Sequence, residues 1–188
     1  MLGHVNIDDT DFIGRDADLS RLSELLEGHR LVTVLGPAGM GKTRLAMRAA
    51  DLMRWPAVVA DLSHATSADG ICAAVAASLG QPVEGAPGFD VVGAALAARG
   101  PCLLVADNLE QVTAPGAAAV AAWLGAAPEL RLLVTSRERL GVRGEILHEL
   151  GPLGVPAGDD PRGSDAAELF TRRAREVRPD FDPLQDPA

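Results

Sequence analysis

The sequence predicts an α/β fold in which helices cover both faces of a mainly parallel, five-stranded sheet. Short apolar runs bounded by turn residues alternate with segments of helical periodicity, as in repeated βαβ units. A complete phosphate-loop pattern falls between one such run and the helix that follows it. The chain of 188 residues is 47% hydrophobic and 23% charged, which suits one α/β core and part of a second unit.

The first half of the chain predicts two strands and four helices. The continuous apolar runs that suit strands buried on both faces are Leu31–Leu35 and Ala57–Leu62. Helical spacing of apolar residues predicts helices over Asp18–Gly28, Lys42–Met53, Thr66 to about Leu79, and Phe89–Arg99. Thr66 and Asp69 resemble a capping box at the start of the third helix, and Gln81–Gly88 is a Pro/Gly-rich loop.

The second half continues the same alternation. The third and fourth strands are predicted at Cys102–Ala106, which ends in Asp107, and at Leu130–Thr135, with a helix over Ala117–Ala126 between them. Glu145–Leu150 alternates in hydrophobicity and is predicted as an edge or fifth strand.

Four segments make up the predicted domain organisation. Residues 1–10 are an N-terminal tail, residues 11–150 the α/β domain, and residues 151–163 a linker rich in Pro, Gly and Asp. Residues 164–188 begin with a helix capped by Ser164. Its acidic residues come early and its arginines late, as the helix dipole favours, and one face carries Ala166, Leu169, Phe170 and Val177.

Composition limits the partners of the chain. The net charge of −9 argues against direct nucleic-acid binding by this segment, which needs a concentrated basic face. No apolar run approaches the roughly 20 residues that cross a bilayer, and Met1–Phe12 lacks the features of a secretory signal. We therefore expect a cytoplasmic protein with no membrane association, in which Cys72 and Cys102 are buried core residues.

The phosphate-loop pattern G-x-x-x-x-G-K-[ST] is met in full by Gly36-Pro37-Ala38-Gly39-Met40-Gly41-Lys42-Thr43. Glycines let the loop wrap around phosphates with its N–H groups inward, and the following helix directs its N-terminal dipole at the same anion. Lys42, the only lysine of the chain, is predicted to reach the β- and γ-phosphates, and the Thr43 hydroxyl to ligate Mg²⁺. The alternative is a chance glycine turn, against which the flanking strand and helix both argue.

The segment Leu103–Asp107 resembles a Walker B strand, which delivers a carboxylate to Mg²⁺ beside the phosphate loop. The next residue, Asn108, is an amide and cannot act as a base for the attacking water. Glu110 could substitute as the catalytic carboxylate, and it could equally be a surface helix residue.

Arg137 follows the predicted fourth strand and its hydroxyl pair, Thr135 and Ser136. A guanidinium at this edge of the sheet could sense the γ-phosphate, because it forks onto phosphate oxygens. The alternative is a solvent-facing arginine in a turn that also holds Glu138 and Arg139.

Several motifs now stand in a recognisable order. They are FIGRD at Phe12–Asp16, the phosphate loop, LLVADNLEQV, LLVTSRERLGVRGE and LGPL. Over about Asp11–Phe181 this order resembles the nucleotide-binding domain of STAND ATPases. The likeness is greatest to the NB-ARC-like domains of large bacterial LuxR-type and SARP-type transcriptional regulators.

The resemblance implies a P-loop NTPase three-layer sandwich, followed by the start of a helical lid at the Ser164 helix. It also implies that Ile13 and Gly14 lie against adenine, with Arg15 nearby. The predicted nucleotide-binding residues are therefore these three together with Gly36 through Arg44. The chain stops before the glycine-proline and histidine motifs of the family, and so before the rest of the lid, the winged-helix domain and the sensor domains of a full-length relative.

These observations predict an ATP/ADP-binding switch module that uses Mg²⁺ and hydrolyses ATP slowly at most, because Asn108 stands where a carboxylate is expected. The preference for adenine rests on the resemblance, since no guanine-reading N-K-x-D motif is present. One alternative is a small P-loop phosphotransferase or an AAA-type ATPase, which would show fast turnover or use an acceptor. Another is a truncated, non-catalytic remnant that folds poorly.

Overall fold

A computed structural model describes residues 12–80, 87–155 and 164–182 of the chain. The predicted N-terminal tail, most of the predicted linker and the loop at 81–86 therefore lie outside the described residues. Within the described part, no helix is long and apolar enough to cross a membrane.

The sheet has five parallel strands in the order β2-β3-β4-β1-β5, which confirms the predicted fold class. Their bounds are β1 Leu31–Leu35, β2 Ala57–Asp61, β3 Cys102–Asp107, β4 Leu130–Ser136 and β5 Ile146–Glu149. The segment predicted as an edge or fifth strand is the edge strand β5, which pairs with β1. Because the strands are parallel, all their carboxyl ends meet at one edge of the sheet.

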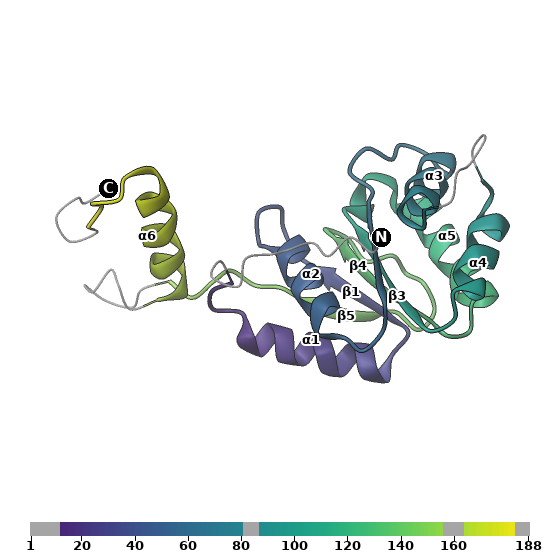
Figure 1. The fold of residues 1–188 in the computed structure, drawn as a ribbon, viewed down its shortest axis with the longest axis horizontal. Coiled ribbons are helices and arrows are strands. Elements are labelled where there is room, and N and C mark those ends of the chain that lie inside the picture. Colours follow the sequence, from purple (N-terminus) through teal and green to yellow (C-terminus); the bar gives the residue numbers. More distant parts are fainter. Residues whose placement is uncertain (1–11, 81–86, 156–163, 183–188) are drawn as a thin grey trace.

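Helices cover both faces of the sheet (Figure 1). One face is covered by α1 Asp16–Gly28 and α2 Lys42–Leu52, and the other by α3 Ala68–Ser78, α4 Phe89–Ala98 and α5 Thr113–Ala126. Alternate residues of a strand enter the two cores: Leu104 packs with α3–α5, and Leu103 packs with α1 and α2. Both faces being covered explains why the strand sequences are continuously apolar.

Three predicted helix starts are wrong by a few residues. The side chain that caps α3 is Ser67, which accepts a hydrogen bond from the Gly70 N–H, so Thr66 does not form the predicted capping box. Helix α1 starts at Asp16, two residues before the prediction. Helix α5 starts at Thr113 instead of Ala117, after the 3-10 helix η2 Leu109–Val112, with Pro115 in its first turn. Proline fits there because the N–H groups of a first helical turn have no intrahelical partner.

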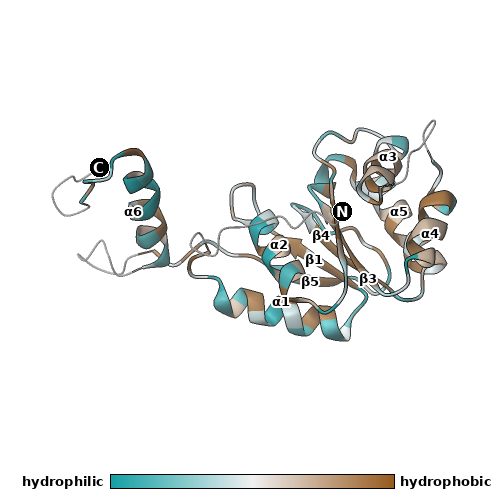
Figure 2. Cartoon of the chain, in the orientation of Figure 1, coloured by the Kyte–Doolittle hydropathy of each residue, from teal (hydrophilic) through white to brown (hydrophobic). Residues whose placement is uncertain are grey.

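The last helix, α6 Asp165–Val177, stands apart from the sheet and its covering helices (Figure 1). Ser164 caps it as predicted, accepting a hydrogen bond from the Ala167 N–H. None of its residues is buried, and hydrophilic residues make up much of the helix (Figure 2). Its N-terminus touches the main body, where the Ala166 N–H donates to the Gly154 carbonyl.

Candidate functional site

The predicted phosphate loop connects the end of β1 to the start of α2. Gly39 and Gly41 have φ angles of 78° and 87°, a left-handed region that favours glycine. A Cβ atom at either position would meet nothing within 4 Å, so the loop faces open space. No side chain caps α2, whose N-cap residue is Gly41. The N–H groups of its first turn are thus available to an anion.

Gly36 serves a different purpose from the other loop glycines. A Cβ there would lie 2.9 Å from the Leu150 carbonyl oxygen at the end of β5. The first glycine of the pattern is therefore required because the loop packs closely against the segment at Leu150.

Lys42 is folded back onto the loop. Its side chain is 7% exposed, and its ammonium group donates to the carbonyl oxygens of Gly36 at 2.8 Å and Pro37 at 2.9 Å. Both partners are neutral, so the positive charge is held beside the loop and is available to phosphate oxygens. The structure thus fits the phosphate group that the sequence predicts.

Asp107 ends β3 and is 3% exposed. It accepts hydrogen bonds from the Thr43 hydroxyl at 2.8 and 3.0 Å, from the Thr135 hydroxyl, and from the Asn108 amide at 3.0 Å. Thr43 and Asp107, the two predicted Mg²⁺ ligands, are therefore in direct contact. A hydroxyl and a carboxylate at one point form an oxygen donor set of the kind that Mg²⁺ prefers.

Asn108 is the only non-glycine residue with a positive φ among the described residues, at φ 62° and ψ 41°. Its backbone N–H donates to the Thr135 hydroxyl at 2.9 Å. Its side-chain amide donates to Asp107 and, at 3.3 Å, to Asp61 at the end of β2. A hydrogen bond from the Ser63 N–H lowers the pKa of Asp61.

Glu110 lies in the 3-10 helix η2, and its side chain is 10% exposed. It is therefore not a surface helix residue. One carboxylate oxygen lies 3.4 Å from the Arg137 guanidinium, whereas the other is buried without a hydrogen-bond partner. Arg137 is about half exposed, at 52%. The structure brings these two predicted residues together, and the exposed side of the arginine faces solvent.

The loop that carries Arg137 is held by Glu145, which the sequence did not single out. The Glu145 carboxylate accepts hydrogen bonds from the Thr33 hydroxyl at 2.7 Å and from the N–H groups of Leu140 and Gly141 at 3.0 and 2.8 Å. Thr33 is fully buried in β1, so this carboxylate fixes the loop to the centre of the sheet.

A cavity of about 410 Å³ lies beside the phosphate loop. Six of the predicted nucleotide-binding residues line it: Ile13, Arg15, Gly39, Met40, Gly41 and Arg44. The sequence missed the rest of its lining, which is Phe12, Pro152, Leu153, Val155, Ala166 and Leu169. Pro152 and Leu153 belong to the LGPL motif, which was the available signal. The mainly apolar lining and this volume suit a planar organic group.

Gly14 does not line that cavity, although it was predicted to contact adenine. Its φ is 68°, and a Cβ there would overlap the side chain of Asp165 at the start of α6. Glycine at this position therefore lets α6 approach the main body.

Arg15 lines the cavity and also braces it. Its guanidinium donates to the carbonyls of Met40 at 3.2 Å and Gly151 at 2.8 Å and pairs with Asp18 at 3.0 Å. Asp18 in turn contacts His148 of β5 at 3.1 Å. This arginine thus joins the phosphate loop to the segment after β5.

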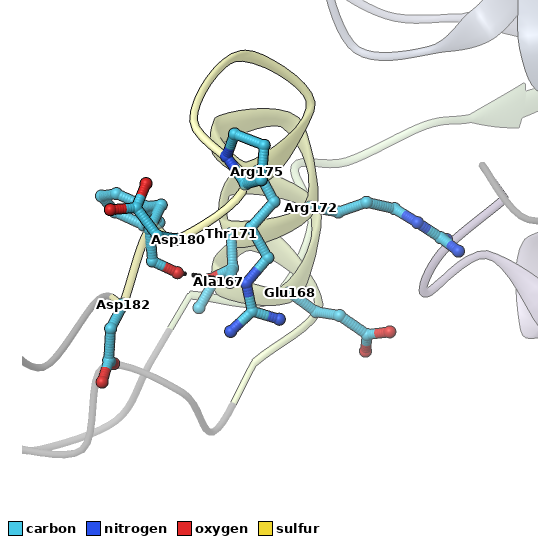
Figure 3. A pocket seen from close by; sticks show the side chains of 9 residues that line it. Ala167, Glu168, Thr171, Arg172, Arg175, Asp180 and Asp182 are labelled. Atoms are coloured by element: carbon cyan, nitrogen blue, oxygen red, sulfur yellow. Dashed lines mark hydrogen bonds between the residues drawn. The ribbon is translucent and has the colours of Figure 1, made fainter.

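A second, wider hollow of about 800 Å³ lies along α6 and the segment after it (Figure 3). Its walls come only from residues 167–182, and none of the predicted site residues lines it. It is larger than the cavity beside the phosphate loop, but it has no part in the candidate site.

The parallel sheet with a phosphate loop after β1 and an aspartate after β3 defines a P-loop NTPase fold. The chain matches the AAA domain family over residues 7–142 and belongs to that family.

Two proteins of one organism are similar to this chain. An uncharacterized protein of Mycobacterium tuberculosis is 38% identical over 92% of this chain and 43% of its own length. A second protein of that organism, provisionally named an HTH-type transcriptional regulator, is 36% identical over 84% of this chain and 17% of its own length. This chain therefore spans less than half of either relative.

Among solved structures, Cdc6p of Pyrobaculum aerophilum has a TM-score of 0.52 and 20% identity, over 73% of this chain and 45% of that one. A STAND protein with a tetratricopeptide repeat sensor from Pyrococcus horikoshii has a TM-score of 0.49 and 19% identity, over 93% of this chain and 26% of that one.

Proposed function

We propose that this domain binds ATP and ADP with Mg²⁺ and acts as the nucleotide-dependent switch of a STAND-type signalling or transcriptional regulator, with slow ATP hydrolysis. The observation that carries the proposal is the contact between Thr43 and Asp107 beside a phosphate loop that holds the Lys42 ammonium on neutral carbonyls.

Each part of the nucleotide has a matching part of the site. The N–H groups of Ala38 through Thr43 and the Lys42 ammonium would hold the phosphates, and Thr43 and Asp107 would hold Mg²⁺. Bound there, Mg²⁺ would neutralise charge on the phosphate oxygens. The adenine would occupy the cavity beside Ile13 and Met40, whose lining is mostly apolar.

The switch would work through Arg137 and Glu110. In the structure the guanidinium lies 3.4 Å from the Glu110 carboxylate. The γ-phosphate of ATP would offer Arg137 an anion of higher charge than the Glu110 carboxylate, whereas ADP has no γ-phosphate. The two nucleotides would therefore favour different positions of this arginine, which supplies the differential contact that a switch requires.

Helix α6 is the proposed start of a lid, joined by the linker at 151–163 to the nucleotide-binding domain at 11–150. Ala166 and Leu169 of α6 line the cavity proposed for adenine. Because a bound base would touch both the main body and α6, nucleotide occupancy would influence where this helix lies.

Hydrolysis would be slow because Asn108 carries no proton-accepting carboxylate beside Asp107. Glu110 is the proposed base, since it has a buried oxygen without a hydrogen-bond partner.

The regulatory role rests on the relatives, one of which bears the name of a transcriptional regulator. A full-length protein of this kind would carry lid, winged-helix and sensor domains and work in the cytoplasm. This acidic chain would leave nucleic-acid contacts to another domain, given its net charge of −9.

Calorimetric titration of ATP and ADP, each with and without Mg²⁺, tests the proposal. Lys42→Ala should weaken ATP binding by about 100-fold or more, because two charge-assisted hydrogen bonds are lost. Arg21→Ala, which removes an exposed cation on α1, is the control and should bind as the wild type does. Equal affinities in all three proteins would overturn the site assignment.

Membership of the AAA domain family favours one alternative, a rapidly cycling AAA-type ATPase. Steady-state phosphate release separates the two functions. Turnover near the enzyme median of about 10 s⁻¹ would favour the rapidly cycling ATPase, whereas turnover far below that value would favour the switch.

A further inference from the structure

Strand β2 brings a second carboxylate to the site. Asp61 is the last residue of β2 and is the register partner of Asp107 on β3. The Asn108 amide nitrogen lies between them, 3.0 Å from an Asp107 oxygen and 3.3 Å from an Asp61 oxygen. Asp61 is itself oriented by the Ser63 N–H at 2.9 Å. Two contacts through the Asn108 amide thus link Asp61, at the end of β2, to the predicted Mg²⁺ ligand.

These contacts fix the orientation of the Asn108 side chain. A primary amide has two N–H hydrogens and one carbonyl oxygen. Because Asp107 and Asp61 accept both hydrogens, the carbonyl oxygen must be directed away from the two carboxylates. A reversed amide would place its oxygen against two negative charges. The backbone cannot rotate freely either, since the Asn108 N–H is bound to Thr135.

The left-handed conformation of Asn108 points to function. A non-glycine residue in this region is strained, and such residues cluster at active sites. The conformation is held by contacts to two aspartates and a threonine, all at the carboxyl edge where the phosphates are proposed to bind. Asp61 is exposed, so its contact with the amide adds little to stability.

We propose that Asp61 is a positioning residue that holds the Asn108 carbonyl oxygen ready to accept a hydrogen bond from the water that attacks ATP. This inference rests on the proposed function. The water oxygen forms a bond to the γ-phosphorus while the bond from that phosphorus to the β–γ bridging oxygen breaks, and its electron pair leaves with ADP. ATP⁴⁻ and water give ADP³⁻ and H₂PO₄⁻, so both water protons end on phosphate, one of them after a transfer through Glu110, the proposed base. Asn108 orients the water and takes no proton.

Four variants separate this role from a structural one. Asp61→Ala removes the acceptor, and kcat should fall by about tenfold at unchanged KM, because a reacting group is misplaced. Asp61→Asn keeps a side-chain oxygen for Asn108 and should retain most of the activity. Asn108→Ala should lower kcat at least as much as Asp61→Ala does. Adding Asp61→Ala to Asn108→Ala should change nothing further, because Asp61 acts through the amide.

The matched control is Asp51→Ala, which removes an exposed aspartate at the far end of α2 and should leave kcat unchanged. A second readout needs no turnover. ADP with Mg²⁺ and aluminium fluoride mimics the transferring phosphate, so Asp61→Ala should weaken its binding by about tenfold while ADP alone binds normally.

The outcomes distinguish the two hypotheses. If the wild type neither hydrolyses ATP nor binds the aluminium fluoride complex, the proposed hydrolysis fails and this inference fails with it. If the wild type does both and Asp61→Ala behaves like the wild type, only the positioning role is overturned. Equal losses from Asp61→Ala in the two Asn108 backgrounds would also overturn it, since Asp61 would then act independently of the amide.

Discussion

The two edges of the sheet use charged residues differently. At the amino edge, Arg30 donates to the carbonyls of Leu124, Ala127 and Leu130, and Arg131 donates to two carbonyls at the end of α1 while stacking on Trp55. At the carboxyl edge, Lys42 and Arg15 also donate to backbone carbonyls, but other charged groups contact side chains: Asp107 accepts from the Thr43 and Thr135 hydroxyls, and Glu110 pairs with Arg137.

The carboxyl edge also contains a strained Asn108 and a buried Glu110 oxygen without a partner. The hydrogen bonds from Arg30 and Arg131 to backbone carbonyls stabilise the fold. Unsatisfied and strained groups lower stability and are expected where a ligand completes the site.

The largest effect should follow from removing the charge of Asp107. Asp107→Asn keeps the size of the side chain and an acceptor for Thr135, but lacks the negative charge that Mg²⁺ requires. We expect the Mg²⁺-dependent part of ATP affinity to fall by about 100-fold, since a metal ion at such a site contributes several kcal/mol. Titration calorimetry with and without Mg²⁺ measures this.

ADP binding without Mg²⁺ provides the control for this variant. It should be nearly unchanged, because the phosphate loop and Lys42 remain intact. A variant that kept the full Mg²⁺ dependence would show that Asp107 is not a metal ligand.

Substitutions at the amino edge should lower the free energy of unfolding and leave ATP affinity unchanged. Arg30→Ala leaves three carbonyl groups without their shared donor, and we expect unfolding to become easier by about 2 kcal/mol. Arg30→Lys keeps the charge but lacks the planar guanidinium, so its stability should lie between those of the wild type and Arg30→Ala. Thermal melting measures the loss, and a parallel change in ATP affinity would contradict the separation of the two edges.

The sequence predicted the arrangement of the sheet well because each strand is a continuous apolar run between two covered faces. The errors concern helix starts. Thr66 and Ser67 are both capping residues, and the sequence alone could not choose between neighbours of equal propensity. Helix α5 was predicted from Ala117, whereas it starts at Thr113 and holds Pro115 in its first turn, where proline is compatible with a helix.

For the site, sequence patterns were sufficient where each ligand belongs to a recognisable local motif. Lys42, Thr43 and Asp107 meet as expected from two local motifs on parallel strands. Asp61 and Glu145 were missed because their partners lie 47 and 112 residues away, and only the strand order brings them together. Gly14 was assigned to adenine through a family resemblance, whereas here it faces α6.

A smaller effect should follow from loosening the loop between β4 and β5, which carries Arg137 and is held by Glu145. Glu145→Ala removes the acceptor of the Leu140 and Gly141 amides. We expect these two amides to exchange with solvent about tenfold faster, since a hydrogen bond to a charged group contributes about 1.5 kcal/mol. Exchange followed by NMR tests this, with the amides of β3 as the internal reference. Unchanged exchange at both positions would show that the loop is held by other contacts.

The smallest predicted effect concerns alkaline pH and contrasts the two ends of β3. The strand begins at Cys102 and ends at Asp107, and both are buried. Burial raises the pKa of the Cys102 thiol, and burial together with nearby carboxylates raises the pKa of Cys72 to about 11 from 9.0. The unfolded chain therefore loses these protons at lower pH than the folded chain does. Stability should fall as pH rises above 9, by about 1 kcal/mol at pH 10 for Cys72 and further in the same direction for Cys102.

This chain is suited to the measurement because it contains no tyrosine and a single lysine. Few other side chains titrate between pH 8 and 10.5, so the thiols should dominate the pH dependence there. Melting temperatures under reducing conditions should decline over this range in the wild type and stay nearly level in Cys72→Ala/Cys102→Ala. An equal decline in both proteins would show that the two thiols do not cause it.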